Sequence, residues 1–283
     1  MSIRLAQRLN GEIVNADSMQ VYKDVPTLTA RPDDSEKQGI PHHLFGFLDA
    51  GEKYSVVRWL EQASLTADKI LERGGVPVVT GGTGMYLDAF MNGINEVPEV
   101  PLSVRTEVNE RFEKLGKEAF LNEYLTLDPS FRFVDKQRLC RAAEVLKATG
   151  KTLREWQKAP KQKAYDADFY TILILPPRPL LYERCDKRFD LMMKRDVFSE
   201  VKALFDKKPP FDAGVLKAVG VRELKAVSDN EISLEEAVEN AKRATRRYAK
   251  RQITWFSHRF IAKKVVFNEN FDEILTNVLR FLQ

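Results

Sequence analysis

The sequence has few cysteines and no long apolar run in its 283 residues. No segment approaches the roughly 20 apolar residues that span a bilayer, which argues against a membrane protein. The amino-terminal segment, MSIRLAQRLNGE, lacks the apolar core of a secretory signal. Cys140 and Cys185 stand far apart and in no C-x-x-C pair, which excludes a disulfide scaffold and a cysteine-based zinc site. We therefore expect a cytoplasmic protein without membrane segments.

A Walker-type phosphate-binding loop is also missing. No G-x-x-x-x-G-K-[ST] motif occurs, so the sequence lacks the lysine and the hydroxyl that such a loop supplies. Residues 2–9 nevertheless have the apolar spacing of a helix, which Asn10 and Gly11 end. The segment has the pattern of a helix that would follow a phosphate-binding loop, and Met1 is expected to cut into that helix.

Acidic residues are absent from one stretch near the carboxyl end. Between Asn240 and Asn268 there is no Asp or Glu, whereas nine residues are Lys or Arg. Without these nine cations, the net charge of +4 becomes −5 for the rest of the chain. Concentrated positive charge is typical of a surface that binds a polyanion, although a solvated helix face explains an arbitrary basic run equally well.

The elements that are present follow an α/β order. Residues 12–16 and 76–80 are short apolar runs typical of buried strands, and a helix is predicted between them over residues 55–73. The glycine-rich turn of residues 81–84 (GGTG) then leads into another helix. Strand, helix, strand and helix in this order predict an α/β fold with a parallel sheet.

The pattern changes at residues 96–101, which contain two prolines. Polar, strongly helical residues follow, and a strand pattern returns only at residues 169–175. The predicted division is an α/β core of residues 1–96 and 167–283, with basic helices at its carboxyl end, and a helical insertion domain of residues 97–166. Helices of the insertion are predicted over residues 102–114, 117–125 and 136–149.

Candidate functional groups lie where the predicted strands end. Asp17 follows the first strand, and open α/β folds bind ligands at the carboxyl ends of parallel strands. Its carboxylate can act as a general base or hold a metal, although an Asp followed by a Ser is more often part of a simple turn. Residues 81–84 let the backbone approach a phosphate at a helix N-terminus, and close packing of strand and helix explains the same glycines equally well.

Two arginines form a further candidate. Arg184 and Arg188 are one helical turn apart, so they share a face on which two guanidinium groups suit a phosphate. From the spacing alone, surface ion pairs with Glu183 and Asp186 are the commoner outcome. The three histidines have no carboxylate or thiol at ligand spacing, so they predict no metal cluster.

Residues 246–256 (RRYAKRQITWF) interleave basic and aromatic side chains. This mixture neutralises phosphates and offers stacking surfaces, and single-stranded or looped RNA prefers it. Packing in the core is expected to take at least part of the set Ile253, Trp255 and Phe256.

Seven segments, taken in this order, resemble the tRNA dimethylallyltransferases, which are the isopentenyltransferases that prenylate the adenosine next to the anticodon. They span almost the whole chain, and they are jointly specific although each alone is weak. The segments are EIVNADSMQVYKDV (12–25), GIPHHLFGFLDAGEKYSV (39–56), VPVVTGGTGMYL (76–87), DKQRLCRAAEVLKATGKTL (135–153), YERCDKRFDLMM (182–193), LKAVGVREL (216–224) and RRYAKRQITWF (246–256).

The resemblance implies a P-loop-NTPase-like α/β core with a helical insertion. It also implies a channel that dimethylallyl diphosphate enters from one end and a flipped-out adenosine from the other. Asp17 would accept a proton from the adenine exocyclic amine as this nitrogen attacks the allylic carbon, and Thr83 would lie beside the reaction centre. Arg188, helped by Arg184, would stabilise the departing diphosphate, and Mg2+ would bridge diphosphate oxygens.

Contacts with the tRNA anticodon loop are likewise implied by the resemblance, and a monomer is expected because the basic surface would clamp the tRNA. The matching positions are Asp17, Ser18, Met19, Gln20, Thr83, Arg105, Gln137, Arg138, Leu139, Cys140, Arg141, Lys217, Ala218, Val219, Gly220, Val221, Arg222, Lys250, Arg251, Gln252, Ile253, Thr254, Trp255, Phe256 and Ser257.

The chain departs from this family in one respect. The family has a G-P-T-x-x-G-K-[ST] loop shortly before the segment that opens this chain, and that loop is absent here. We therefore expect weaker diphosphate binding and slower turnover, with tRNA binding largely kept. Two alternatives stay open: a truncated, catalytically impaired tRNA-binding relative, and a P-loop small-molecule kinase. A kinase has no need of the basic, aromatic-rich residues 246–256, and the missing Walker lysine would harm it more.

Overall fold

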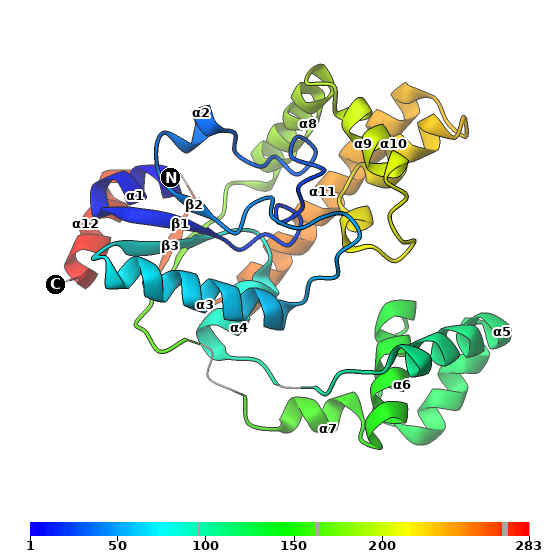
Figure 1. Ribbon diagram of the computed structural model, residues 1–283. Helices are drawn as coiled ribbons and strands as arrows, with labels where there is room; N and C mark the ends of the chain where they lie inside the picture. Colours follow the sequence, from blue (N-terminus) through cyan, green and yellow to red (C-terminus); the bar gives the residue numbers. More distant parts are fainter. Residues whose placement is uncertain (96, 162–164, 268–270, 283) are drawn as a thin grey trace. The chain divides into compact units, whose positions relative to one another are not determined.

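The computed structural model describes residues 1–95, 97–161, 165–267 and 271–282, and the chain divides into two compact units (Figure 1). The core unit comprises Met1–Met91 and Ala164–Gln283, and the helical unit comprises Asn92–Lys163. Each unit has its own cluster of buried apolar side chains, so each is described by itself. The divisions expected from the sequence lie at residues 96–97 and 166–167.

The elements have the following bounds. The core unit contains α1 (Ser2–Leu9), β1 (Gly11–Asn15), α2 (Asp34–Lys37), β2 (His42–His43), α3 (Val56–Glu72), β3 (Val76–Thr80), α4 (Gly84–Asn92), β4 (Ile172–Ile174), α8 (Arg178–Lys194), α9 (Val197–Asp206), the 3-10 helix η1 (Gly214–Lys217), α10 (Val221–Ser228), α11 (Leu234–Arg259), β5 (Lys264–Val266) and α12 (Phe271–Leu282). The helical unit contains α5 (Leu102–Leu127), α6 (Lys136–Thr149) and α7 (Leu153–Lys158).

β1 is the middle strand of a parallel sheet with the order β2-β1-β3. Its residues pair one by one with those of β3, from Gly11 opposite Val76 to Asn15 opposite Thr80. α3 lies along this sheet (Figure 1), against which Trp59 and other side chains at helical spacing are fully buried. The predicted α/β fold with a parallel sheet is confirmed. β3 is predicted to be buried, but its residues are only partly buried, because β3 is an edge strand of this sheet.

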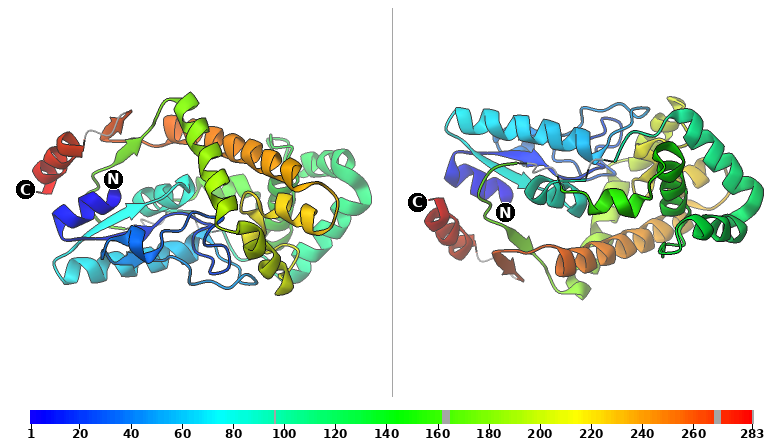
Figure 2. Two further views of the ribbon diagram at one scale, coloured as in Figure 1. Left: turned by 90° about the horizontal axis from the view of Figure 1, so that it is seen from above. Right: turned by 90° about the horizontal axis from the view of Figure 1, so that it is seen from below.

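β4 and β5 form a second, two-stranded parallel sheet. Beside it, Leu5 of α1 shares a buried cluster with Val266 of β5 and with Phe271 and Ile274 of α12. The two ends of the chain therefore lie at the same end of the core unit (Figure 2). No helix in the described part of the chain is long and apolar enough to cross a bilayer.

The largest apolar cluster joins α8, α9, α10 and α11 to the loop that follows β1. Phe189 of α8 and Leu204 of α9 are buried in it, together with Val21 and Val25 of the loop. α8 and α11 lie side by side (Figure 2), and α11 presents the small Ala241 to the cluster. The loop after β1 is thus packed on four helices rather than left in solvent.

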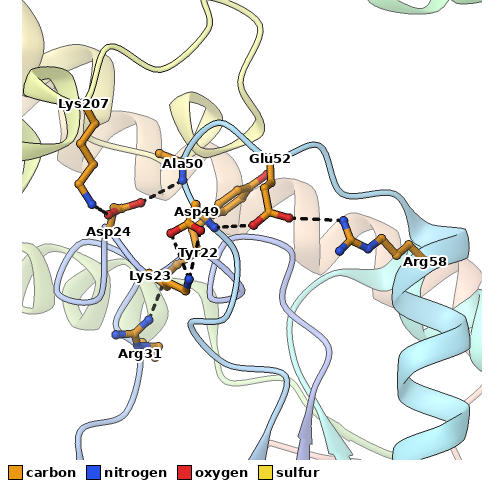
Figure 3. A network of polar contacts seen from close by, with 9 residues as sticks. All are labelled: Tyr22, Lys23, Asp24, Arg31, Asp49, Ala50, Glu52, Arg58 and Lys207. Atoms are coloured by element: carbon orange, nitrogen blue, oxygen red, sulfur yellow. Dashed lines mark hydrogen bonds and ion pairs between the residues drawn. The ribbon is translucent and has the colours of Figure 1, made fainter.

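Polar contacts also hold the loop after β1 (Figure 3). Asp24 accepts a hydrogen bond from the backbone N–H of Ala50 at 3.0 Å and forms an ion pair with Lys207 at the end of α9. Lys23 reaches both carboxylate oxygens of Asp49, at 3.1 and 3.2 Å. Because these partners come from three segments, they tie this loop to the loop after β2 and to α9.

Glu200 of α9 provides a further anchor for the same loop. Its two carboxylate oxygens accept hydrogen bonds from the backbone N–H groups of Thr27 and Leu28, at 2.8 and 2.9 Å. The amide of Gln20 donates to the carbonyl of Thr29 at 2.9 Å. Side chains therefore satisfy several backbone polar groups of the loop, which helps to fix the path of the loop.

The helical unit is built around a bent helix. α5 is interrupted at Gly116, whose φ of 75° and ψ of 168° lie outside the helical region, and this confirms the predicted break between residues 114 and 117. Phe112 and Phe120, on the two halves of α5, meet with their ring centroids 5.3 Å apart, and Leu139 of α6 completes the core.

Candidate active site

The carboxyl end of β1 is locked by the buried side chain of Asn15. Its Nδ2 donates to the carbonyls of Asp17 and Leu44 at 3.0 and 2.9 Å, while its Oδ1 accepts from the N–H of Asp17 at 2.8 Å. The indole of Trp59 donates to the Asn15 carbonyl at 2.7 Å. The backbone of Asp17 is therefore held from both sides.

The carboxylate of Asp17 is half-buried above the end of β1. Its loss of solvation raises its pKa above the usual range. Two effects oppose this rise in part: hydrogen bonds from the N–H groups of Met19 and Gln20, at 2.8 and 3.3 Å, and the charge of Arg188. Both backbone hydrogen bonds end on Oδ1. A carboxylate with a raised pKa is a stronger base than an ordinary aspartate.

The glycine turn that follows β3 lies directly against the end of β1. A Cβ on Gly81 would come within 2.2 Å of the carbonyl carbon of Ala16, so only glycine allows this approach. Thr83 donates its N–H to the Ala16 carbonyl at 3.1 Å, and its hydroxyl oxygen accepts from the N–H of Ser18 at 2.9 Å. The predicted residues Asp17, Ser18 and Thr83 are therefore brought together.

The positive charge of Arg188, on α8, acts on this group and lowers the pKa of Asp17. Arg184 lies one turn earlier on α8, and both arginine side chains are exposed. Their acidic neighbours are engaged elsewhere: Asp186 accepts from Arg246 at 2.6 and 2.7 Å, and Glu183 pairs with Lys187 at 2.5 Å. Among the described residues, neither the Arg184 nor the Arg188 side chain forms a hydrogen bond or close ion pair, so the surface pairing that the spacing favours is not formed, although the charge of Arg184 contributes to the lowered pKa of Glu183.

α11 closes the other side of the glycine turn. Gln252 donates from Nε2 to the carbonyl of Gly82 at 2.9 Å. The ring of Trp255 occupies the space in front of Gly84, where a Cβ would come within 2.2 Å of it. Burial raises the pKa of Tyr248, and the charge of Asp17 adds to this effect.

Sequence reasoning missed Tyr248 as a site residue. It stands four residues before Gln252 on α11, so the two side chains share a helix face. The signal in the sequence is the spacing of Tyr248, Gln252 and Trp255, which places all three on one helix face. An apolar helix face has the same spacing, so this signal alone does not separate a site from a core.

The other predicted tRNA contacts of the core unit divide into exposed and buried groups. Lys217, Arg222, Lys250, Arg251, Thr254 and Ser257 are exposed, and Val219, Ile253 and Phe256 are partly buried. Ala218, Gly220 and Val221 are buried, and the latter two begin α10 against the cluster of α8 and α9. The predicted core packing of Ile253, Trp255 and Phe256 is therefore partial.

The remaining predicted positions belong to the helical unit. Arg105 of α5 and Arg141 of α6 both approach the nearly buried Glu144, at 3.8 and 3.7 Å. Gln137 and Arg138 are exposed at the start of α6, where Asp135 caps the helix. Leu139 and Cys140 are buried, because they face the core between α5 and α6.

Metal ligands do not gather in the described part of the chain, which contains no group of three His, Cys, Asp or Glu side chains arranged to hold an ion. His43, one of the three histidines, contacts Glu12 at 2.6 Å. Both cysteines are free and buried.

A family model described as IPP transferase matches residues 20–259 of the chain. The chain is 45% identical over 259 residues to a tRNA dimethylallyltransferase of Phenylobacterium zucineum, which covers 90% of this chain and 84% of the relative. It is 41% identical over 261 residues to a tRNA dimethylallyltransferase of Rhizobium etli, which covers 90% of this chain and 88% of the relative.

Solved structures are similar along nearly the whole chain. A tRNA isopentenylpyrophosphate transferase of Bacillus halodurans has a TM-score of 0.70 and 30% identity, covering 99% of this chain and 90% of that one. A eukaryotic dimethylallyltransferase acting on tRNA has a TM-score of 0.79 and 27% identity, covering 100% of this chain and 76% of that one. Sequence and structural similarity thus lead to the same group of proteins.

Proposed function

The chain belongs to the IPP transferase family, and from this premise we propose that it is a tRNA dimethylallyltransferase. It transfers a dimethylallyl group from dimethylallyl diphosphate to the exocyclic N6 of the adenosine 3′ to the anticodon in tRNA. The observation that carries this proposal is the half-buried Asp17 carboxylate, on which the charge of Arg188 acts and whose neighbour Ser18 is hydrogen-bonded to the Thr83 hydroxyl.

Asp17 is the general base of the transfer. The adenine N6 forms a bond to the allylic carbon, the bond from this carbon to the diphosphate oxygen breaks, and the N6 proton moves to the carboxylate. Oδ1 already accepts two backbone hydrogen bonds, so Oδ2 is the oxygen with capacity for the amine. The raised pKa of Asp17 favours the transfer, since a stronger base takes the proton more readily.

The leaving diphosphate takes up the electrons of the broken bond, and its negative charge grows during the step. Arg188 and Arg184 supply the compensating charge, because their guanidinium groups are on one face of α8 and have no ion-pair partner among the described residues. Preorganised donors that stabilise developing charge are commonly the largest contribution to catalysis. The hydroxyl of Thr83 is held by two hydrogen bonds to Ser18, the residue after the base.

Magnesium would travel with the donor as part of a magnesium–diphosphate complex. Mg2+ prefers oxygen ligands and keeps several waters, so it binds through substrate phosphates and one or two carboxylates rather than a protein cage. The site fits this description, since it offers the single carboxylate of Asp17 and the hydroxyls of Ser18 and Thr83. The ion would neutralise charge on the diphosphate.

The tRNA anticodon loop would bind to exposed basic residues of both units. Lys250 and Arg251 are exposed on α11, and Lys217 and Arg222 are exposed around η1 and α10. In the helical unit, Arg138 is exposed at the start of α6. Positive side chains of this kind neutralise phosphates and set the position of the nucleic acid.

We also propose that the protein works as a cytoplasmic monomer. Its two cysteines are free and buried, as a reducing compartment favours. The basic face of α11 is assigned to RNA, which leaves it unsuited to a second copy of the same positive charge.

The test is incorporation of labelled dimethylallyl groups from dimethylallyl diphosphate into unmodified tRNA. We expect label in a tRNA with adenosine 3′ to the anticodon and none in a tRNA with guanosine at that position. Asp17→Asn should lower incorporation at least about 100-fold, whereas Asp34→Asn should not, because Asp34 is exposed in α2 and pairs with Lys37.

Two results would count against the proposal. Equal incorporation by the Asp17→Asn variant would remove Asp17 from the reaction. Tight, salt-sensitive tRNA binding without any incorporation by the parent chain would identify a tRNA-binding relative that does not catalyse transfer.

A further inference from the structure

Gln252 occupies a central place between α11 and the glycine turn. Its Nε2 donates to the carbonyl of Gly82 at 2.9 Å. The fit is tight, since a Cβ on Gly82 would lie 2.3 Å from the Gln252 nitrogen. The amide of Gln252 is thus already engaged inside the protein, although the family resemblance implies that it contacts tRNA.

The turn that Gln252 holds is the one that carries Thr83. On the side of β1, Thr83 is fixed by its N–H bond to Ala16 and by the bond that its hydroxyl accepts from Ser18. On the side of α11, Gln252 donates its hydrogen bond to the carbonyl of Gly82, the residue before Thr83. Without it, the peptide between Gly82 and Thr83 would be held from one side alone.

We propose that Gln252 is a positioning residue, which fixes the glycine turn so that the Thr83 hydroxyl stays aligned with Asp17. This inference rests on the proposed function of the site. Two residues before Gln252, Lys250 is exposed on the outer face of the same helix. The same helix therefore carries a proposed RNA contact on its outer face and the contact to the glycine turn on its inner face. RNA that binds to α11 is thereby held in a fixed position relative to Thr83.

The test compares Gln252→Met and Gln252→Glu with the parent protein. Met keeps the length of the side chain without a donor, and Glu keeps its shape while placing a carboxylate against the Gly82 carbonyl. Gln7→Met and Gln7→Glu are matched controls, because Gln7 is an exposed glutamine of α1 that contacts Gln38. Three quantities are measured: the single-turnover rate at saturating tRNA and diphosphate, the tRNA dissociation constant, and hydrogen exchange at the Thr83 amide.

We expect both Gln252 variants to lower the saturating rate about tenfold, which corresponds to the loss of one hydrogen bond worth about 1.4 kcal/mol. The tRNA dissociation constant should stay within about twofold of the parent value, and the Thr83 amide should exchange faster. A tenfold weaker tRNA affinity with an unchanged rate would overturn the proposal and assign Gln252 to RNA contact. Unchanged rate and exchange would overturn it as well.

The hydrogen-exchange measurement separates this proposal from the proposed function. If the parent chain transfers no label, the function fails, while faster exchange at Thr83 in Gln252→Met still supports the positioning contact. If the parent is active and exchange at Thr83 matches that of the Gln7 controls, the positioning role fails and the function stands.

Discussion

At the scale of single residues, the environment of Asp17 predicts how the reaction depends on pH. Only the ionised carboxylate accepts a proton, and loss of solvation raises its pKa above that of an ordinary aspartate. The transfer rate should therefore rise with pH through this raised pKa and then level off. Asp17→Asn should remove this dependence and lower the rate about 100- to 10,000-fold, as measured by single-turnover kinetics across pH.

The charge of Arg188 gives a check on this assignment. It lowers the pKa of Asp17, so Arg188→Gln should move the rising limb of the pH profile to higher pH. Arg178→Gln, at the exposed start of α8, should leave the limb in place. A limb that moves equally in both variants, or in neither, would contradict the proximity of Arg188 to the base.

A second residue prediction concerns the contact between Gly84 and Trp255. Gly84→Ala would place a Cβ within 2.2 Å of the indole ring, so either the ring or the turn must move. We expect a loss of about 1–3 kcal/mol in the free energy of unfolding, measured with urea. Gly51→Ala is the control, because the nearest atom to its Cβ would be Pro210 Cδ at 3.7 Å. Equal stability of the two variants would refute the tight packing.

The residues of the site were predictable to different degrees. Asp17 could be predicted because a strand pattern ends just before it, and Thr83 because glycines surround it. Their roles came from the family resemblance rather than from spacing. The pairing of Gln252 with Gly82 could not be predicted from the sequence, since nothing local in either segment indicates a hydrogen bond between residues 170 positions apart.

At the scale of elements, Glu200 links α9 to the loop that begins at Asp17. It accepts two backbone N–H bonds, so Glu200→Ala would leave the donors of Thr27 and the buried Leu28 without their partner. We expect a loss of about 1–3 kcal/mol in the free energy of unfolding, measured with urea. Glu231→Ala, an exposed change, should cost less than about 0.5 kcal/mol. Similar losses in both variants would show that Glu200 is no anchor.

The amino-terminal half of β1 carries a pH-sensitive contact. Hydrogen bonds from Arg73 lower the pKa of Glu12 from 4.5 to about 2, against the effect of burial and with further help from His43. Because the folded pKa is depressed, the stabilisation is present above pH 4.5 and is lost as the pH falls towards 2.

Glu12→Gln should therefore be less stable than the parent protein at neutral pH, and the difference should shrink between pH 4.5 and 2. Urea unfolding at a series of pH values measures this. Glu61→Gln, exposed on α3, serves as the control. A difference that stays constant over the range would show that Glu12 does not titrate with a depressed pKa.

Element boundaries were predictable where local chemistry sets them. α6 matches its prediction of residues 136–149, because Asp135 accepts from the N–H of Arg138 at one end and Gly150 adopts a left-handed conformation at the other. The strand predicted over residues 169–175 is limited to Ile172–Ile174. Phe169 and Tyr170 lie outside the strand and pack against other aromatic rings. An apolar run in the sequence does not distinguish packing of this kind from strand pairing.

At the scale of the whole molecule, the distribution of charge predicts how tRNA binding responds to salt. Nine of the cations lie between Asn240 and Asn268, and without them the chain is net negative. Replacing Lys250 and Arg251 together by Gln should reduce the slope of log affinity against log salt by about 1–2, since each phosphate contact contributes about 0.7–0.9. Filter binding over a range of salt concentrations measures the slope.

A matched pair of substitutions tests whether position or total charge matters. Lys202→Gln with Lys208→Gln removes the same charge from exposed positions in and after α9. This pair should leave the slope nearly unchanged. If it reduces the slope as much as the α11 pair does, binding follows total charge and no specific surface on α11 is needed.

The hydrogen bond from Gln252 to Gly82 has a consequence for the order in which the protein is made. It joins residues 170 positions apart, so the turn of Thr83 and the loop of Asp17 leave the ribosome long before their partner helix exists. Domains are built from the amino end during synthesis at about 5–20 residues per second. The catalytic turn therefore waits on the order of ten seconds, and the nascent chain acquires its active site only after α11 has emerged.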